Sequence, residues 1–251
     1  RQMCIRDSYQ NNLIGTLNLL ENMRNHQVRR LVFSSSASIY GEQDRVPIDE
    51  NCPIGTIAHP YGQSKRMIEQ MLEHIAHAEP DLWAITILRY FNPVGAHESG
   101  LIGEAPLATP TNLMPYIMRV AAGKQDKITV FGNDYPTPDG TGVRDYIHVV
   151  DLAIAHVKAL HRLANSAGIT ILNLGTGQGH SVLELIAAFT KVCGAELRYQ
   201  IVARRPGDIA CSYADPARAR KLLDWKTERN LLDMCRDSWH WQLHNPNGYP
   251  D

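Results

Sequence analysis

Three short, almost unbroken apolar runs constrain the fold more than any other feature of this sequence. They are LVF at 31–33, WAITIL at 83–88 and ITILNL at 169–174. Each run has the length of a strand. An uninterrupted apolar strand is typical of a parallel sheet that is covered on both faces. These runs therefore favour a sheet with helices on either side.

Helical patterns lie between the runs. Pro60 precedes an amphipathic stretch over 61–77, and proline is favoured in the first turn of a helix. Apolar residues at helical spacing also precede the first run, at Leu13, Leu17, Leu20 and Met23. The alternation of helix and strand predicts an α/β fold with a doubly wound parallel sheet, followed by a smaller and looser C-terminal α/β portion.

Later in the chain, polar residues mark helix starts. Ser181 and Glu184 form a capping box, and Asp151 is placed to cap a helix that runs through Leu163. From about residue 93 the sequence becomes rich in glycine and proline, which indicates loops. We therefore expect a change of organisation near residue 93, where the regular alternation of helix and strand gives way to a looser α/β portion.

The first eight residues, RQMCIRDS, carry no hydrophobic period. We interpret residues 1–8 as foreign to the protein and leave them out of the fold prediction. The composition is that of a globular protein, with 44% hydrophobic and 20% charged residues. A net charge of -1 gives no electrostatic reason to expect nucleic acid or a membrane as partner.

Cysteine and histidine usage argues against metal and disulfide chemistry. The five cysteines are widely spaced, without a C-x-x-C, so we expect neither a disulfide framework nor a zinc site, and a reducing cytoplasm fits them. His240 and His244 are four residues apart on an expected helix. No third ligand lies near them in the sequence, so we predict no metal.

The stretch HPYGQSK places Tyr61 four residues before Lys65. On a helix, this spacing brings the two Cβ atoms to about 5–6 Å. The ammonium favours the phenolate and lowers the tyrosine pKa from about 10, which would make Tyr61 a usable base. The alternative is two solvated side chains on a helix surface. Context favours the base, because Ser34 to Ser36 end one strand and Asn92 follows another, and functional groups collect at such strand ends.

A glycine-rich stretch, LGTGQGHS, is the nearest match to a dinucleotide-binding turn. Gly175, Gly177 and Gly179 lack the spacing of the third glycine, and no acidic residue follows at the expected distance. We therefore interpret the stretch as an ordinary turn between a strand and a helix.

Several longer motifs carry a resemblance. SSSASIYG, YGQSK, LRYFNPVGAH, FGNDYPTPDGTGVRDYIHV, LNLGTGQGHSVLEL and RRPGD together resemble the UDP-glucose 4-epimerase family of extended short-chain dehydrogenases/reductases. The match runs from about Tyr9 to the end of the chain. The glycine-rich cofactor turn of that family has no counterpart here, so the resemblance implies an N-terminally truncated member. The fold it implies is an incomplete doubly wound Rossmann-type parallel sheet with a smaller C-terminal α/β portion that binds substrate. Residues 9–92 would be the C-terminal part of the NAD-binding Rossmann domain, and residues 93–251 mainly the UDP-sugar-binding portion, with some segments that return to the sheet.

The resemblance implies an NAD-dependent interconversion of UDP-galactose and UDP-glucose through a 4-keto sugar that turns within the pocket. Tyr61, Lys65 and Ser36 match the catalytic residues. The same three residues and Asn11, Tyr90 and Phe91 match positions that contact NAD.

The resemblance also implies how a UDP-sugar is held. Arg144 and Arg205 match the arginines that bind the diphosphate, and Asp208 matches the acceptor of the ribose hydroxyls. The remaining matched substrate contacts are Ser36, Tyr61, Asn92, Asn112, Leu113 and Phe131.

The position that limits the sugar pocket aligns with Ser212, and a slip of one residue would place Cys211 or Tyr213 there. In this family a small residue at that position leaves room for an N-acetyl group. We therefore predict that UDP-N-acetyl sugars are also accepted.

Two other functions remain open from the sequence. A nucleotide-sugar 4,6-dehydratase would use the same scaffold, but such relatives place two carboxylates directly after the serine, where this chain has Ala37 and Ser38. An inactive UDP-sugar-binding fragment would explain the absent cofactor turn. The resemblance further suggests a cytoplasmic homodimer formed through helices that include the one with Tyr61.

Overall fold

The computed structural model describes residues 2–57, 59–106, 110 and 112–249. The chain divides into two compact units. Unit 1 comprises Arg1–Phe91, Ile154–Leu174 and Ala214–Trp225, and unit 2 comprises Asn92–Ala153, Gly175–Tyr213 and Lys226–Asp251. The chain therefore passes from one unit to the other several times, and each unit is assembled from segments that are distant in the sequence.

Unit 1 is an α/β layer structure. Its elements are α1 (Gln2–Tyr9), the π-helical η1 (Gln10–Ile14), α2 (Gly15–Asn25), β1 (Arg30–Ser36), the 3-10 helix η2 (Ala37–Tyr40), α3 (Pro60–Ala78), β2 (Ala84–Tyr90), β7 (Gly168–Leu174) and α7 (Ala217–Leu223). Helix α5 (Val149–Leu163) begins in unit 2 and continues into unit 1. The three strands pair in parallel in the order β1-β2-β7, which confirms the predicted fold class.

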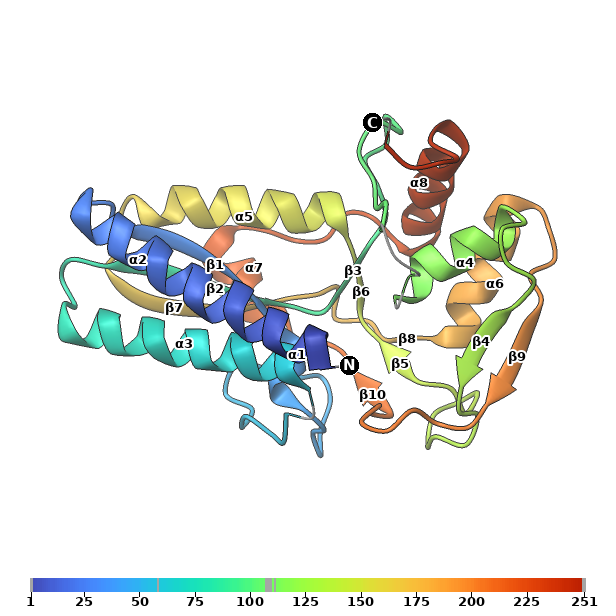
Figure 1. Cartoon of the computed structure of the whole chain (residues 1–251), viewed down its shortest axis with the longest axis horizontal. Coiled ribbons are helices and arrows are strands. Elements are labelled where there is room, and N and C mark those ends of the chain that lie inside the picture. Colours follow the sequence, from blue (N-terminus) through green and yellow to red (C-terminus); the bar gives the residue numbers. More distant parts are fainter. Residues whose placement is uncertain (1, 58, 107–109, 111, 250–251) are drawn as a thin grey trace. The chain divides into compact units, whose positions relative to one another are not determined.

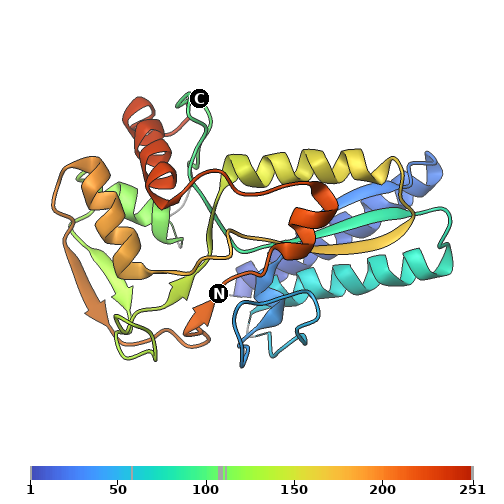
Figure 2. The ribbon, with the colours of Figure 1, turned by 180° about the vertical axis from the view of Figure 1, so that it is seen from behind.

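The two faces of this sheet are covered by different helices. Helices α2 and α3 pack on one face, through a buried cluster that includes Leu20, Leu72 and Ile87. On the other face α5 contacts the strands, where His156 meets the Ser34 hydroxyl. Both views of the ribbon have α3 and α5 on opposite sides of the strands (Figure 1, Figure 2). Burial on both faces explains why the strand sequences are almost continuously apolar.

Unit 2 combines short strands with helices. Its elements are β3 (Asn92–Val94), α4 (Leu113–Ala121), β4 (Ile128–Phe131), β5 (Val143–Arg144), β6 (Tyr146–His148), β8 (His180–Ser181), α6 (Val182–Cys193), β9 (Tyr199–Val202), β10 (Cys211–Ser212) and α8 (Leu231–His244). β3 pairs with β6 and β4 with β9, both in parallel, and β5 lies between β10 and β8.

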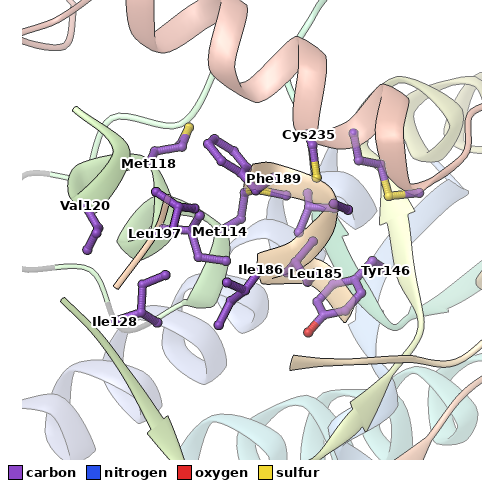
Figure 3. Close-up of a cluster of buried hydrophobic side chains, with 14 of the residues drawn as sticks. Met114, Met118, Val120, Ile128, Tyr146, Leu185, Ile186, Phe189, Leu197 and Cys235 are labelled. Carbon is purple, nitrogen blue, oxygen red and sulfur yellow. The ribbon is translucent and has the colours of Figure 1, made fainter. Parts of the chain in front are cut away.

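The core of unit 2 lies between α4, α6 and α8. Met114, Phe189 and Cys235 are almost fully buried there, one from each helix (Figure 3). Ile128 adds a contact from β4. This core supports the strands whose ends carry the candidate substrate residues, so the local position of those residues depends on its packing.

Some local predictions are confirmed and others are wrong. Ser181 and Glu184 form the predicted capping box at the start of α6. Asp151 does not cap α5, because the helix begins at Val149 and the Asp151 carboxylate instead accepts hydrogen bonds from the backbone of Glu228 and Arg229. Of the apolar residues noted at helical spacing, Leu20 and Met23 are buried, whereas Leu17 is 53% exposed.

The segment before residue 9 is helical from Gln2 and contacts α3. Its interpretation as foreign to the protein stays a prediction. Among the residues described, none of the helices has both the length and the apolar character needed to cross a membrane.

Candidate functional site

The first group of candidate residues lies where β1 ends and α3 begins. Ser36 is the last residue of β1, and Tyr61 is the second residue of α3, directly after Pro60. A hydrogen bond joins the side chains of Ser36 and Tyr61. Lys65 follows one helical turn later. The structure therefore brings together the three residues that the sequence predicts as catalytic, and all three belong to unit 1.

The Lys65 ammonium is held beside both the strand and the tyrosine. Its Nζ atom donates a hydrogen bond of 2.9 Å to the backbone carbonyl of Ser34. The same atom lies 5.0 Å from the centre of the Phe33 ring and 5.6 Å from the centre of the Tyr61 ring. Partial burial lowers the pKa of Lys65. The ammonium is thus close to Tyr61 but is bonded to the strand.

The expected lowering of the Tyr61 pKa is not found in this structure. The side chain is 44% exposed, yet desolvation by the surrounding protein is the largest effect and raises the pKa. The nearby Tyr90 also raises the pKa, and the hydrogen bond to Ser36 opposes both effects. The sequence reasoning was wrong in giving Lys65 the main effect, because proximity on the helix does not fix where the ammonium points.

The asparagine that approaches this group is not the one singled out from the sequence. Asn11 is exposed, and its amide contacts the side chain of Asn12. The Asn12 amide donates a 2.9 Å hydrogen bond to the Ser64 hydroxyl, which in turn donates to the backbone carbonyl of Tyr61 at 2.8 Å. Ser64 stands between Tyr61 and Lys65 in YGQSK, so its spacing of three from Tyr61 was a signal for this contact.

The end of β2 carries the next two candidates. Tyr90 is half-buried, and its ring centre lies 6.1 Å from that of His156 on α5. Phe91 is 7% exposed and packs in a cluster with Ile39 and Tyr40. The Phe91 side chain therefore belongs to the apolar interior of unit 1, which limits it to a backbone contact or an edge contact with any cofactor.

The second group of candidates surrounds a cavity of about 440 Å³ that lies within unit 2. The sequence predicted seven of its lining residues, and these are Asn92, Asn112, Leu113, Phe131, Arg144, Arg205 and Asp208. They come from segments spread over more than a hundred positions. The residues that the sequence predicts to bind one ligand therefore lie around one cavity.

Charge and aromatic surface meet at one end of this lining. The Arg205 Nε atom donates to the Asp208 carboxylate at 2.9 Å, and its guanidinium lies 4.6 Å from the centre of the Phe131 ring. Arg144 donates to the backbone carbonyl of Val143 at 2.8 Å. A planar guanidinium of this kind is suited to two-pronged binding of phosphate groups.

Further polar groups line the cavity. Glu104 was not singled out from the sequence. Glu104 is exposed overall, yet desolvation raises the pKa of its carboxyl group, and a hydrogen bond from Asn112 opposes this shift. Tyr135 also contributes to the lining, and its hydroxyl has no partner among the described residues. The sequence offered no signal for either residue beyond its place in a loop.

Ser212, the predicted limit of the sugar pocket, lies outside this lining. It is 8% exposed in β10, where it pairs with Arg144 of β5. Its neighbour Cys211 is half-buried, and burial raises the pKa of the Cys211 thiol.

Backbone amides of the glycine-rich turn after β7 already have a hydrogen-bond acceptor within the protein. The Asp145 carboxylate accepts hydrogen bonds from the backbone of Thr176 at 2.8 Å and of Gly177 at 3.1 Å. A phosphate would need these same amide groups, so the structure supports the interpretation of LGTGQGHS as an ordinary turn. Asp145 is fully buried and fixes the turn to β6.

The rings of His240 and His244 meet edge to face on α8, with ring centres 4.3 Å apart. In the part of the chain that the structure describes, no three histidine, cysteine or acidic side chains gather as a metal would require.

Comparison with known proteins identifies the family of the chain. A model of the NAD dependent epimerase/dehydratase family matches residues 5–175. The chain therefore belongs to this family. The UDP-glucose 4-epimerase of Yersinia pestis is 55% identical over 243 residues, which are 97% of this chain and 72% of that protein. This similarity confirms the resemblance seen in the sequence motifs.

Solved structures agree. A UDP-glucose 4-epimerase from Stenotrophomonas maltophila, with bound NAD and formylated UDP-arabinopyranose, is 52% identical and superposes with a TM-score of 0.92 over 95% of this chain and 70% of that one. The enzyme from Bifidobacterium longum, in complex with NAD+ and UDP, also has 52% identity and a TM-score of 0.92, over 96% and 71% of the two chains.

Proposed function

We propose that this chain belongs to an isomerase that interconverts UDP-galactose and UDP-glucose with NAD as cofactor, as its 4-epimerase relatives are named to do. The observation that carries the proposal is the grouping of Ser36, Tyr61 and Lys65 where β1 ends and α3 begins. A phenol bonded to a hydroxyl, with an ammonium 5.6 Å from its ring, is suited to moving a proton at a sugar hydroxyl.

In this proposal the chain's own residues accept and return the proton of the sugar 4-hydroxyl. Tyr61 takes the proton from the 4-hydroxyl of the sugar as that carbon is oxidised, and returns it when the 4-keto sugar is reduced on its other face. Ser36 shares the proton through its hydrogen bond to Tyr61. The raised pKa of Tyr61 means that further positive charge is needed to stabilise the phenolate.

The strand ends of unit 1 fit a nicotinamide cofactor. Lys65 has an ammonium that can exchange the Ser34 carbonyl for ribose hydroxyls, and Tyr90 and Asn11 are accessible side chains in the same unit. NAD supplies the hydride acceptor and donor, together with a positive charge. The assignment of unit 1 to the cofactor and of unit 2 to the nucleotide sugar follows from these residue types.

The cavity of unit 2 fits the uridine diphosphate moiety. Arg144 and Arg205 offer positive charge to a diphosphate, Asp208 can accept hydrogen bonds from ribose hydroxyls, and Phe131 offers a flat surface to the base. These contacts hold the nucleotide and leave the sugar free. A loosely held sugar is what the reaction requires, since the keto sugar must turn over before reduction.

Activity on UDP-N-acetyl sugars is part of the proposal. Ser212 is a small residue that aligns with the position limiting the sugar pocket, although it lies outside the lining of the cavity described above. The expected result is turnover of UDP-N-acetylglucosamine by the parent and its loss in Ser212→Tyr, while both still convert UDP-galactose. Equal rates on the N-acetyl sugar in the two proteins would remove Ser212 from this role.

We also propose a homodimer that forms through α2 and α3, in the cytoplasm. Ile14, Leu17 and Leu19 are each more than half exposed in this region, and a second copy would cover them. Light scattering of purified protein tests this, and a monomer at micromolar concentration would contradict it.

The function is tested by replacing one hydroxyl in the protein that carries this sequence. Tyr61→Phe should reduce the rate of UDP-galactose conversion by about 10²–10⁴-fold with UDP binding intact. Tyr199→Phe, at an exposed position of β9, is the matched control and should retain the parent rate. Parent protein that binds UDP without converting any sugar would favour a binding fragment, and release of a 4-keto-6-deoxy sugar would favour a dehydratase.

A further inference from the structure

A row of buried polar side chains crosses the sheet of unit 1 one residue before its carboxyl edge. Ser35 pairs with Arg89, and Arg89 pairs with Asn173, in the register of β1, β2 and β7. Their exposed fractions are 0%, 3% and 0%. Because side chains alternate along a strand, this row faces α3, and the next row, with Ser36 and Tyr90, faces the other way.

Glu69 of α3 joins this row by three hydrogen bonds. Its Oε1 atom accepts from the Ser35 hydroxyl at 2.5 Å and from Arg89 Nε at 3.0 Å. Its Oε2 atom accepts from Arg89 Nη2 at 2.6 Å. Glu69 is fully buried, so the helix is attached to two strands at once by a desolvated ion pair.

The remaining edge of the guanidinium extends the attachment to the third strand. Arg89 Nη1 donates to the Tyr40 hydroxyl at 2.9 Å, and that hydroxyl donates to the Asn173 side chain at 2.8 Å. The Asn173 amide then donates to the backbone carbonyl of Ile48 at 2.9 Å. Burial disfavours the charged guanidinium, but its bonds to Glu69 and Tyr40 prevail and raise the pKa of Arg89.

Stability alone is a weak reason for this arrangement. A buried ion pair contributes little compared with apolar side chains of the same size, since desolvation offsets the attraction. The ion pair does fix the position of α3 relative to the strands, because its hydrogen bonds have preferred lengths and directions. Glu69 follows Lys65 by four residues and Tyr61 by eight, on the same side of α3, and Ser35 directly precedes Ser36.

We propose that Glu69 and Arg89 are positioning residues, which fix α3 against β1 and so set Tyr61 and Lys65 against Ser36 for proton transfer. This inference rests on the proposed function. Neither residue touches the sugar in this account. Both act through the helix and the strand that carry the reacting groups.

The test replaces the pair without changing the net charge. In Glu69→Met/Arg89→Met, the two ends of the ion pair become apolar side chains of similar length. We expect kcat to fall by about 10- to 100-fold with little change in KM, and the melting temperature not to fall. Leu72→Ala, at a fully buried position of the same helix, is the control that lowers stability without touching the row.

A second measurement needs no turnover. The phenolate absorbance of Tyr61, taken as the difference from Tyr61→Phe, gives its pKa directly. Burial raises this pKa and the Ser36 bond holds it down, so a loosened α3 should raise the pKa further. Leu72→Ala should leave this titration at the parent value.

The outcomes separate the inference from the function on which it rests. A double variant with parental kcat and parental Tyr61 titration would overturn the inference. So would a loss of kcat that merely follows the loss of folded protein, as in Leu72→Ala.

If the double variant does not fold, Ser35→Ala provides a second test. It removes one hydrogen bond to Glu69 and should produce the same changes on a smaller scale. Parental kcat and parental Tyr61 titration in Ser35→Ala would count against the inference. Parent protein without turnover refutes the proposed function, while the titration still tests the positioning.

Discussion

The polar groups of the two units are held in different ways. In unit 1 the side chains behind the candidate catalytic residues are buried and bonded on every side, as in Glu69 and Arg89. In unit 2 the candidate substrate residues are partly exposed and bonded to one another, as in Arg205 and Asp208, whose side chains are 50% and 25% exposed. The first is a fixed frame, and the second is a set of groups that can exchange partners when a ligand binds.

The difference follows from solvent access. A buried charge that loses its partner stays desolvated, so the pair is costly to break. An exposed pair is replaced by water at little cost, so its members are free to turn to a phosphate or a ribose. Proton transfer needs fixed distances, whereas nucleotide binding needs groups that can be released from one another.

The largest effect expected from this comparison is on the stability of unit 1. Glu69→Ala leaves Arg89 buried without its carboxylate and should lower the free energy of unfolding by about 3–5 kcal/mol. Urea denaturation followed by circular dichroism measures this change. The control is Asp126→Ala, which removes an exposed ion pair with Arg198. The Arg198 side chain is 81% exposed and that of Asp126 is 79% exposed, so this variant should leave the urea midpoint unchanged. A loss below about 1 kcal/mol for Glu69→Ala would show that the buried pair behaves like a surface pair.

The second effect concerns ligand affinity in unit 2. Arg144→Ala should weaken UDP binding by about 10- to 100-fold, the loss expected for a charged hydrogen bond to phosphate of about 1.5–3 kcal/mol. Stability should change little, since in the structure Arg144 donates to the adjacent carbonyl of Val143. Isothermal titration calorimetry measures the affinity. Arg198→Ala, an exposed arginine of the same unit outside the cavity, should bind UDP like the parent, and equal affinity in both variants would exclude Arg144 from the phosphate site.

Local sequence patterns predicted the helices and strands of unit 1 better than the side-chain contacts between them. The strands follow from their apolar runs, and Pro60 with the stripe after it predicts α3. Once these elements are known, the meeting of Ser36 and Tyr61 follows, because strand ends and helix starts share one edge of a parallel sheet. The cavity residues of unit 2 were predicted by long motifs, and local periodicity gave no indication of them.

What escaped prediction depends on partners that are distant in the sequence. The row of Ser35, Arg89 and Asn173 exists because of strand register, and nothing near Arg89 in the sequence indicates a partner on α3. Asp151 fits the rule for a helix cap, but its carboxylate binds Arg229 far along the chain. A propensity describes what a residue does with its neighbours, and a tertiary partner overrides it.

A smaller effect, on pH dependence, distinguishes the units further. His148 is fully buried in unit 2, where its Nδ1 accepts from the Val150 amide at 3.1 Å and its Nε2 lies 3.1 Å from Asp237. Burial lowers the pKa of His148, although Asp237 opposes this shift. The unfolded chain therefore binds a proton first, at about pH 6.5, and stability falls as the pH drops below that value.

Urea midpoints measured between pH 8 and pH 5 should decline less steeply in His148→Gln than in the parent. His26→Gln, at an exposed position of unit 1, is the control and should follow the parent curve. Parallel curves for His148→Gln and the parent would mean that groups other than His148 determine the acid response.

The smallest effect tests whether every buried polar group in unit 2 is satisfied. Tyr135 is 6% exposed, and its hydroxyl has no hydrogen-bond partner among the described residues. Removing an unpaired buried hydroxyl should raise stability, so Tyr135→Phe is expected to gain up to about 1 kcal/mol. Tyr116 lines the same cavity, but its hydroxyl accepts from the Gln125 amide, so Tyr116→Phe should lose a similar amount. Thermal unfolding of the two variants measures both signs. If Tyr135→Phe were destabilised as much as Tyr116→Phe, the hydroxyl would be bonded in solution, and unit 2 would resemble the fully bonded frame of unit 1.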